Sequence, residues 1–294
     1  MDFISFCRAH GLMIDYLPPV GIWKRYPTED HPKKRNGAVK FMGTHGFVQN
    51  HAVETTVSVW KSDDPRIDVQ RIHRDASAAH RRMVLERERA AEKGQWILSQ
   101  CVLAPHDYLA SKGFPDEVGN VWMRSDGPLL VIPMRVGADL VGCQLISKAG
   151  EKKFLKGQRT AGASMVFNNR GPAILCEGYA TALSVRAAFS KLSRPFCIHV
   201  CFSASNLKAM AHRMVPGLVV ADNDASGAGE AAARESGWPY WMSDVVGEDA
   251  NDAHRRLGLF RFSQALQRAL LKSASPPAGR PEMRRTAPPQ RLSV

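Results

Sequence analysis

Acidic side chains gather at three places in the C-terminal half of this 294-residue chain. They are Glu177, the pair Asp222 and Asp224, and the pair Asp249 and Asp252. Carboxylates held close together repel one another unless a cation lies between them, and Mg²⁺ and Mn²⁺ prefer hard oxygen ligands. The residue types therefore indicate chemistry that uses a divalent metal ion.

The elements that must position these carboxylates are short apolar strands. From residue 171 onward, apolar runs alternate with helical patterns. The predicted strands are 173–176, 196–202, 218–221 and 238–242, and the predicted helices are 179–189, 206–214 and 229–235. Such alternation is typical of a parallel sheet with helices on both faces, which binds ligands at the carboxyl ends of its strands. We therefore predict an α/β fold in which the acidic clusters meet at one edge of the sheet.

Simpler interpretations of the same region stay open. A carboxylate that follows a strand often serves only as a helix N-cap, and this applies to Asp224 and Asp249 taken singly. Gly227-Ala-Gly229 follows a strand as a dinucleotide fingerprint would, but the carboxylates just before it would repel a pyrophosphate. Ser203-Ala-Ser205 could suggest a nucleophile, yet no His or Asp follows a neighbouring strand as its partner, so a helix cap is favoured. No GxxxxGK[ST] motif occurs, so no helicase motor is expected.

Charge is spread unevenly along the chain. The formal net charge is +12, which favours a polyanionic partner, with nucleic acid ahead of a membrane surface. Residues 171–252 carry six basic and nine acidic side chains, or −3, so the remainder carries +15. An acidic centre with basic flanks suits a protein that holds both a divalent metal and phosphate. For any single Lys, a solvated surface is the simpler interpretation.

Changes of pattern divide the chain into five predicted segments. Residues 1–64 have the strand and turn signals of a small antiparallel β module. Residues 65–120 are expected to form a helical connector, because apolar residues recur there at helical spacing. Residues 121–170 are expected to form a basic strand-rich subdomain, 171–272 the α/β domain, and 273–294 a disordered tail rich in Pro and Arg.

The acidic motifs, taken in order, resemble a known family. Glu177-Gly-Tyr-Ala, Asp222-Asn-Asp224-x-x-Gly227 and Asp249-Ala-Asn-Asp252 are similar to the motifs of the Toprim domain. That domain is shared by bacterial-type DNA primases, topoisomerases of types IA and II, and some nucleases. The preceding segment Leu129–Lys156 resembles the basic subdomain found before Toprim in primases. The likeness is closest to plasmid- and phage-encoded primases and covers Trp96 to about Gly258.

The resemblance implies a role for each acidic residue. It makes Glu177 a general acid/base or a metal ligand, and Asp222, Asp224 and Asp249 metal ligands, with Asp252 as a fourth. It also implies Mg²⁺ or Mn²⁺ as the cofactor, with two ions bound, because nucleotidyl transfer needs an activated oxygen and a neutralised pyrophosphate. The basic residues that would hold triphosphate or template phosphates are Arg135, Lys148, Lys152, Lys153, Lys156 and Arg159.

The N-terminal module departs from the family pattern. Primases of this type commonly begin with a zinc ribbon, but residues 21–60 contain no cysteine. The residues with ligand chemistry are Cys7, His10, His31, His45 and His51. Without a CxxC motif we do not expect zinc, and we expect a ribbon-like fold that has lost its metal. At least three of the five aromatic residues Trp23, Tyr26, Phe41, Phe47 and Trp60 should then pack in its core.

These observations predict a DNA primase that synthesises short RNA primers on single-stranded DNA in plasmid or phage replication. Its partners would be single-stranded DNA and NTPs, with a replicative helicase as a further candidate. The alternatives are a Toprim-type metal-dependent nuclease and a non-catalytic DNA-binding module that loads a helicase. A topoisomerase is disfavoured because no tyrosine has a recognisable surrounding domain. Six scattered cysteines, no apolar run long enough to span a membrane and no secretory signal predict a cytoplasmic protein without membrane contact.

Overall fold

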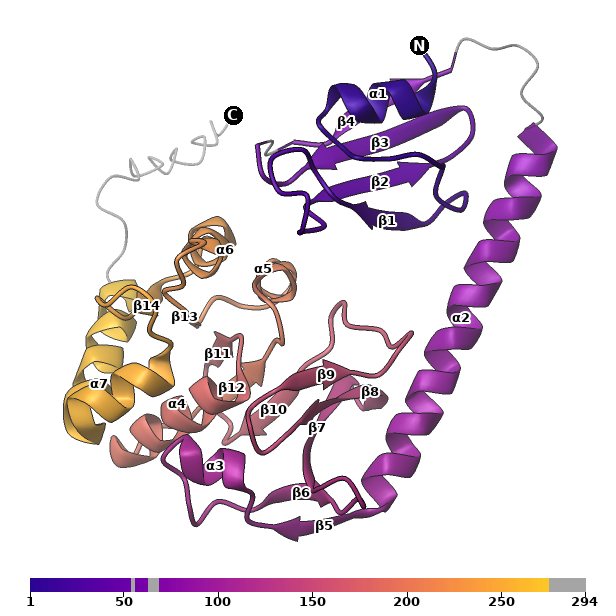
Figure 1. Ribbon diagram of the computed structural model, residues 1–294. Helices are drawn as coiled ribbons and strands as arrows, with labels where there is room; N and C mark the ends of the chain where they lie inside the picture. The colour runs from indigo at the N-terminus through magenta and orange to yellow at the C-terminus, as the bar shows by residue number, and fades with distance from the viewer. Residues whose placement is uncertain (54–55, 63–68, 275–294) are drawn as a thin grey trace, which may run out of the picture. The chain divides into compact units, whose positions relative to one another are not determined.

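A computed structural model describes residues 1–53, 56–62 and 69–274 of the chain (Figure 1). It divides into two compact units, Met1–Lys93 with Leu155–Gln158, and Gly94–Phe154 with Arg159–Val294. The boundary between them falls inside one long helix, α2 (Val69–Ser99). The predicted disordered tail lies outside the described residues from position 275 onward, and the finer division into five segments stays a prediction.

The first unit is built on a four-stranded antiparallel sheet of order β1-β2-β3-β4. Its elements before α2 are α1 (Phe3–Ala9), β1 (Trp23–Tyr26), β2 (Gly37–Phe41), β3 (His45–Asn50) and β4 (Ser58–Lys61). Burial alternates residue by residue along β3, which gives the sheet one buried and one more exposed face. The strand and turn signals of this part of the sequence are therefore accounted for by β1 to β4.

The two faces of this sheet carry different aromatic residues. The buried core on one face consists of Phe3, Cys7, Leu12, Ile14, Tyr26, Val39 and Val48. Phe41 and Trp60 pack against this core, so with Tyr26 three of the five aromatic residues are core residues, as predicted. Trp23 is 47% exposed and its ring lies 6.2 Å from that of Phe47. These two rings belong to the opposite face.

Residues 65–120 contain strands as well as helices. The helices are α2 and α3 (Asp107–Ser111), and the strands are β5 (Cys101–Ala104) and β6 (Gly119–Trp122). The two strands were not expected, because each has four residues and β6 is completed by pairing with residues 129–131 further along the chain. His106 caps α3, since its Nδ1 accepts a hydrogen bond from the Tyr108 N–H at 3.2 Å.

The second unit contains two five-stranded sheets, of which the first is antiparallel with order β5-β6-β7-β8-β9. Its later strands are β7 (Leu129–Val136), β8 (Asp139–Ile146) and β9 (Lys152–Phe154). β7 and β8 form a hairpin whose turn contains Gly137 with a φ of 61°, a conformation that glycine adopts at low cost. This hairpin continues into β9, so it carries the lysines of that strand.

The other sheet has the order β10-β12-β11-β13-β14. Its strands are β10 (Met165–Asn168), β11 (Ala173–Cys176), β12 (Cys197–Val200), β13 (Leu218–Ala221) and β14 (Tyr240–Met242). β11 to β14 run parallel, and β10 pairs with β12 in the antiparallel direction. The parallel arrangement predicted from the alternating pattern is therefore present, and β10 was missed because its pairing partner is distant in sequence.

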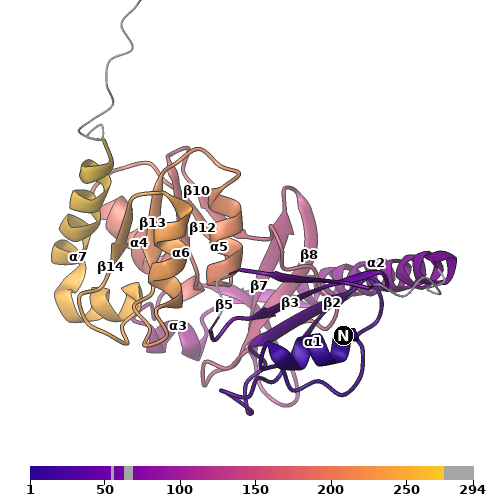
Figure 2. The same ribbon diagram turned by 90° about the horizontal axis from the view of Figure 1, so that it is seen from above.

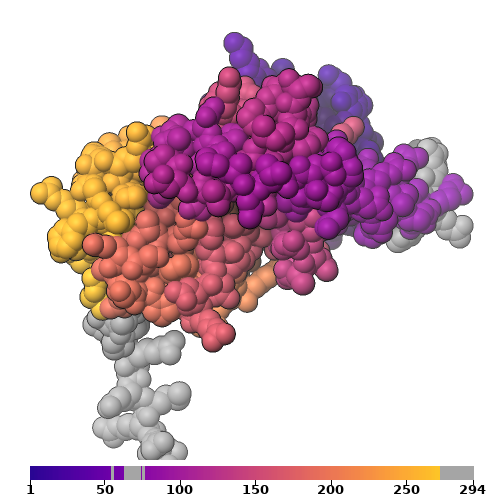
Figure 3. Space-filling view, turned by 90° about the horizontal axis from the view of Figure 1, so that it is seen from below, coloured from indigo at the N-terminus to yellow at the C-terminus, as the bar shows by residue number. Residues whose placement is uncertain are grey.

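Helices cover both faces of the parallel sheet (Figures 1 and 2). They are α4 (Tyr179–Lys191), α5 (Ala204–Ala211), α6 (Ala228–Ser236) and α7 (Ala250–Ala274), the last with a kink at Gly258. α4 and α7 pack against each other on one face, and Figure 3 shows the yellow residues of α7 beside the salmon-coloured segment that contains α4. α5 and α6 lie on the other face.

One apolar core joins the two sheets of the second unit. Leu130, Ile132 and Ile146 of the antiparallel sheet belong to the same buried cluster as Ile174 and Ile198 of the parallel sheet. A bridge between Arg135 and Ser164 also connects β7 to the segment before β10. The shared core therefore holds the antiparallel sheet against the parallel one.

The chain has a mixed α/β fold, as predicted. Across the described ranges, no helix combines the length and apolar character needed to cross a lipid bilayer.

Replacing Gly229, near the start of α6, tests how closely this helix packs against the backbone of Asp222. A Cβ added at Gly229 would lie 2.3 Å from the Asp222 backbone oxygen, whereas a Cβ added at Gly94 of α2 would meet its nearest atoms at 3.4 Å. We expect Gly229→Ala to lower the free energy of unfolding by about 2 kcal/mol or more. Gly94→Ala, the matched control, should change it by less than about 1 kcal/mol and in the stabilising direction. Urea denaturation measures both, and equal effects would contradict the proposed docking.

Candidate active site

The carboxyl ends of β11 and β13 meet where the strand order reverses. From β11 the chain passes to β12 on one side and then returns to β13 on the other. In an open α/β sheet, ligands bind in the crevice that such a reversal creates. Cys176 pairs with Val220, so Glu177 directly follows β11 and Asp222 directly follows β13 at this crevice. The sheet therefore brings two predicted site residues to one place.

A cavity of about 90 Å³ lies at this crevice. Glu177, Asp222 and Asp249 contribute carboxylates to it, and Lys152 of β9 contributes an ammonium group. The other lining residues are Gln144, Gly178, Ala180, Thr181 and Phe202. Three of the five predicted acidic residues and one predicted basic residue thus share a single small cavity.

Asp222 is the most perturbed of these carboxylates. Burial, together with the neighbouring Asp249 and Glu177, raises the pKa of Asp222 from 3.8 to about 7, and Lys152 partly offsets the rise. Its Oδ1 atom is buried and has no hydrogen-bond partner among the described residues. A buried carboxylate oxygen without a partner is costly in the folded state. The site is therefore built to accept something that neutralises or binds this oxygen.

Opposing effects act on the pKa of Glu177. Burial raises the pKa of Glu177, and the charge of Asp224 adds to this effect. Lys152 and the backbone N–H of Ala204 act in the opposite direction, because both stabilise the ionised carboxylate. Glu177 can consequently exist in either protonation state closer to neutral pH than an exposed glutamate, which a general acid or base requires.

Asp249 and Asp252 form a capping arrangement at the start of α7. The Asp252 N–H donates to Asp249 Oδ1 at 2.9 Å, and the Asp249 N–H donates to Asp252 Oδ2 at 3.3 Å. Reciprocal bonds of this kind satisfy amides that a helix N-terminus leaves unpaired. Asp249 also lines the cavity, whereas Asp252 does not. The structure thus assigns a helix-capping contact to Asp252 and leaves Asp249 with both contacts.

Asp224 lies beside the cavity rather than in its lining. It is exposed, and its Oδ1 accepts hydrogen bonds from the Ser226 N–H at 2.9 Å and the Ser226 hydroxyl at 2.5 Å. This turn precedes Gly227, which is the N-cap of α6 and has a φ of 67°. Asp224 still acts on the site through its charge, since it raises the pKa values of Glu177 and Asp222.

The predicted basic residues are not gathered in the same way. Lys152 lines the cavity, while its neighbour Lys153 forms an exposed ion pair with Glu151 at 3.7 Å. Arg135 donates to the Ala138 carbonyl, and Arg159 donates to the Ala161 carbonyl. Lys148 is exposed in the turn between β8 and β9, and Lys156 belongs to the first unit. Only Lys152 among these six is brought to the carboxylates by the second unit.

Several cavity residues had no signal in the sequence. Gln144 comes from β8 of the other sheet, so only the tertiary fold reveals it. Phe202 has a φ of 66°, which is uncommon for an aromatic residue, and its ring meets that of Phe154 edge to face at 6.2 Å. Thr181 Oγ1 is buried without a partner among the described residues. Its place four residues after Glu177, in the first turn of α4, is the one feature that could have suggested it.

The donor set fits a divalent cation. Over residues 1–53, 56–62 and 69–274, no three His, Cys, Asp or Glu side chains stand in a ready-made ligating arrangement. Mg²⁺ commonly takes only one or two protein carboxylates and keeps several waters or substrate phosphates as its other ligands. The unpartnered Oδ1 of Asp222, with Asp249 and Glu177 lining the same cavity, meets that requirement.

Cys7, a residue with zinc-ligand chemistry in the first unit, has a different environment from these carboxylates. It is fully buried in the apolar core of that unit, and burial raises the pKa of its thiol to about 12.

The structure also bears on two alternative interpretations. Ser203 caps α5, since its side chain accepts a hydrogen bond from the Asn206 N–H at 3.2 Å, as expected for a cap. Gly229 permits close packing of α6 on the Asp222 backbone, and Gly227 adopts a φ of 67° that favours glycine, so each glycine has a structural reason to be there. No protein-family model matches the chain.

Replacing Asp222 by Asn should stabilise the metal-free protein. The folded-state pKa of about 7 lies above the ordinary value of 3.8, so the folded chain retains a proton that the unfolded chain releases. The stability that this proton contributes is complete below about pH 4 and is lost as the pH rises through 7. We therefore expect Asp222→Asn to raise the free energy of unfolding by about 1–3 kcal/mol at about pH 8, and by much less at about pH 5.

Urea denaturation in EDTA at the two pH values measures this difference. Asp139→Asn, at the exposed first residue of β8, is the matched control and should have little effect at either pH. A lower free energy of unfolding for Asp222→Asn, or a gain that is the same at both pH values, would contradict the electrostatic account.

Proposed function

We propose that this chain is a Toprim-type DNA primase, which joins ribonucleotides into short primers on single-stranded DNA by metal-dependent nucleotidyl transfer. The observation that carries the proposal is the buried, unpartnered oxygen of Asp222 beside Glu177, Asp249 and Lys152 at the strand-order reversal. Acidic residues at this position suit phosphoryl chemistry, in which positioning and charge neutralisation supply most of the catalysis. The substrates of the proposed reaction are NTPs and a single-stranded DNA template.

The reaction forms one bond and breaks another. The 3′-oxygen of the growing primer attacks the α-phosphorus of the incoming NTP, and the bond from that phosphorus to the pyrophosphate oxygen breaks. The proton of the 3′-hydroxyl must leave as the new bond forms. Glu177 is the residue suited to accept it, because burial and Asp224 raise the pKa of this carboxyl toward the working pH.

Asp222 and Asp249, with Glu177, are the residues that would hold Mg²⁺ or Mn²⁺. When bound, such a cation would activate the attacking oxygen and neutralise charge on the phosphates. The capping bonds at the start of α7 keep Asp249 at the cavity. Asn223, which follows β13, donates a 3.0 Å hydrogen bond to the carbonyl of Ser243 in the loop before α7. These contacts fix the carboxylates before any ligand arrives.

Lys152 is suited to hold the triphosphate. Its ammonium group comes from β9 and faces Glu177 and Asp222, whose pKa values it lowers. A cation beside a carboxylate cluster can pair with phosphate oxygens as they approach. Lys153 is the next residue on the same strand but pairs with Glu151 at the surface. The two lysines therefore form a matched pair for testing.

Primer synthesis on single-stranded templates is the direct test of this proposal. Glu177→Gln and Asp222→Asn should each lower the rate by about a hundredfold or more, because each removes a group that acts on the reacting atoms. Lys152→Ala should lower it by roughly tenfold, and Lys153→Ala should leave it nearly unchanged. Radiolabelled primer products formed with Mg²⁺ or Mn²⁺ provide the readout, and Asp139→Asn is the control.

DNA cleavage and DNA binding, measured beside primer synthesis, separate a primase from a nuclease and from a non-catalytic binding module. Cleavage of labelled DNA with metal and without NTPs, and no primer product, would make the chain a nuclease. Salt-sensitive DNA binding that survives both acidic substitutions, with no product of either kind, would make it a non-catalytic binding module. Undiminished primer synthesis in Glu177→Gln and Asp222→Asn would refute the site assignment.

A further inference from the structure

A cysteine and a histidine of β12 are in contact at a place separate from the carboxylate cavity. The Sγ atom of Cys197 lies 3.4 Å from Nε2 of His199, and Nδ1 of the same imidazole lies 3.3 Å from the Ser164 hydroxyl. All three residues belong to the second unit, and none of them lines the cavity that contains Glu177. A thiol, an imidazole and a hydroxyl therefore form a connected row.

The strand register explains why these side chains meet. Cys197 and His199 are two residues apart on β12, so their side chains project from the same face of the sheet. β10 pairs with β12 and brings Val166 opposite His199, and Ser164 lies two residues before Val166, on the same face. On the other side of β12, β11 places only the small side chain of Ala173 opposite Cys197. The row is therefore fixed by backbone pairing.

Ser164 is placed to orient the imidazole. It is buried, its N–H donates to the Arg135 carbonyl at 2.8 Å, and its carbonyl accepts from the Arg135 N–H at 3.0 Å. In the tautomer with hydrogen on Nδ1, His199 donates to the Ser164 hydroxyl, and its Nε2 accepts the proton of the Cys197 thiol. A nucleophile, a base and a group that orients the base are the parts from which nucleophilic sites are built.

Burial sets the resting charges of the pair. It raises the pKa of the Cys197 thiol and lowers the pKa of the His199 imidazole. At neutral pH the thiol therefore keeps its proton and the imidazole is neutral, so that the imidazole can take this proton as the sulfur attacks. Both side chains are partly exposed, which leaves the sulfur within reach of a small reagent.

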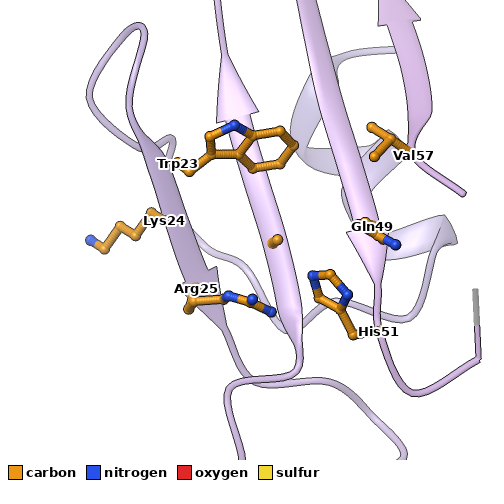
Figure 4. A pocket seen from close by; sticks show the side chains of 7 residues that line it. Trp23, Lys24, Arg25, Gln49, His51 and Val57 are labelled. Atoms are coloured by element: carbon orange, nitrogen blue, oxygen red, sulfur yellow. The ribbon is translucent and has the colours of Figure 1, made fainter. Parts of the chain in front are cut away.

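Two other partly buried histidines have different partners. His51 lines a hollow of about 320 Å³ in the first unit, where Arg25 extends toward it (Figure 4). Burial, together with the charge of Arg25, lowers the pKa of His51. His254 shares a 3.1 Å hydrogen bond with the Ser184 hydroxyl. The contact with a thiol is thus what distinguishes His199 from these two residues.

We infer that Cys197 is a modification site, at which His199 activates the thiol for exchange with low-molecular-weight disulfides such as glutathione disulfide. The Cys197 sulfur attacks one sulfur of the reagent, so that a new S–S bond forms and the old S–S bond breaks. The thiol proton passes to Nε2 of His199 and then to the departing thiolate. Cys197 is thereby oxidised to a mixed disulfide, and the other half of the reagent is reduced to a thiol.

Disulfide exchange suits the groups that are present. It needs only a nucleophile and a proton for the leaving sulfur, whereas acyl transfer also needs hydrogen-bond donors for an oxyanion. Cys201 lies four residues further along β12, roughly 13 Å away at the usual rise of a strand, and Cys176 belongs to the core on the opposite face. Neither can form a disulfide with Cys197, so the mixed disulfide should persist until an external thiol removes it. This inference does not rest on the proposed function.

Peptide mass spectrometry of the full chain, sampled over time in glutathione disulfide at neutral pH, tests this inference. Cys101 is the matched control within the same molecule, because it is also partly exposed and burial also raises the pKa of its thiol. Its Sγ donates to the Ile97 carbonyl at 3.2 Å, so it has a carbonyl in place of a base. We expect Cys197 to gain the glutathione adduct about tenfold faster than Cys101 or more, and dithiothreitol to remove it.

Two positions on the row provide the variants. His199→Gln should lower the rate at Cys197 to about that at Cys101, and leave the rate at Cys101 unchanged. Ser164→Ala should lower the rate at Cys197 by a smaller factor, and Ser164→Thr, which keeps the hydroxyl, should restore it. Equal rates at Cys197 and Cys101 in the wild-type chain, or an unchanged rate at Cys197 in His199→Gln, would overturn the inference.

The buried thiols report on folding in the same spectra. Cys176 and Cys201 are fully buried, so adducts on them would show that a variant has opened its fold. If His199→Gln opens in this way, the wild-type comparison of Cys197 with Cys101 and the Ser164 variants decide the question. A chain that makes no primers but shows the His199-dependent reaction would refute the proposed function and leave this site standing.

Discussion

Repulsion between carboxylates in a small, partly buried cavity is the constraint around which the second unit is arranged. Asp249 and Glu177 disfavour the ionised form of Asp222, Asp224 does the same to Glu177, and burial adds to both effects. The fold supplies only one cation to this cavity, Lys152, among the residues that the structure describes. Gly229 lets α6 dock on the Asp222 backbone, and the capping bonds of α7 hold Asp249, so packing and hydrogen bonds keep both carboxylates at the cavity. A folded chain that retains such an arrangement is suited to bind a compensating charge.

The first unit meets a different constraint. Its sheet needs only one covered face to form a core, and Tyr26 with the neighbouring buried residues supplies that face. The opposite face is then available for Trp23, Phe47 and basic side chains, which contribute little to stability where they are exposed. Four of the basic residues outside 171–252 lie on β1, β2 and β4, namely Lys24, Arg25, Lys40 and Lys61.

The limits of the sequence are clearest at particular residues. Glu177 and Asp222 could be placed because each directly follows a buried apolar strand, and strand ends on one edge of a parallel sheet must converge. Asp252 could not be separated from a metal ligand, since the spacing Asp-x-x-Asp serves equally well as a capping arrangement. Phe202 was beyond prediction, because its backbone conformation and place in the cavity arise only when β12 is packed beside β11. The short strands β5, β6, β9 and β10 were missed for the same reason, since their partners are distant in sequence or their own pattern is too brief to identify.

Calorimetric titration of the metal-free chain with Mn²⁺, at a pH slightly below that of half-ionised Asp222, tests the central claim most directly. Repeating it in buffers with different enthalpies of ionisation measures the protons released as the ion binds. Because Asp222 has a pKa of about 7 in the folded chain, binding at its carboxylate must displace a proton. The account predicts Mn²⁺ binding that releases up to roughly one proton per chain, and loss of that release in Asp222→Asn. Absence of Mn²⁺ binding, or binding with the same proton release in wild-type and Asp222→Asn chains, would contradict it.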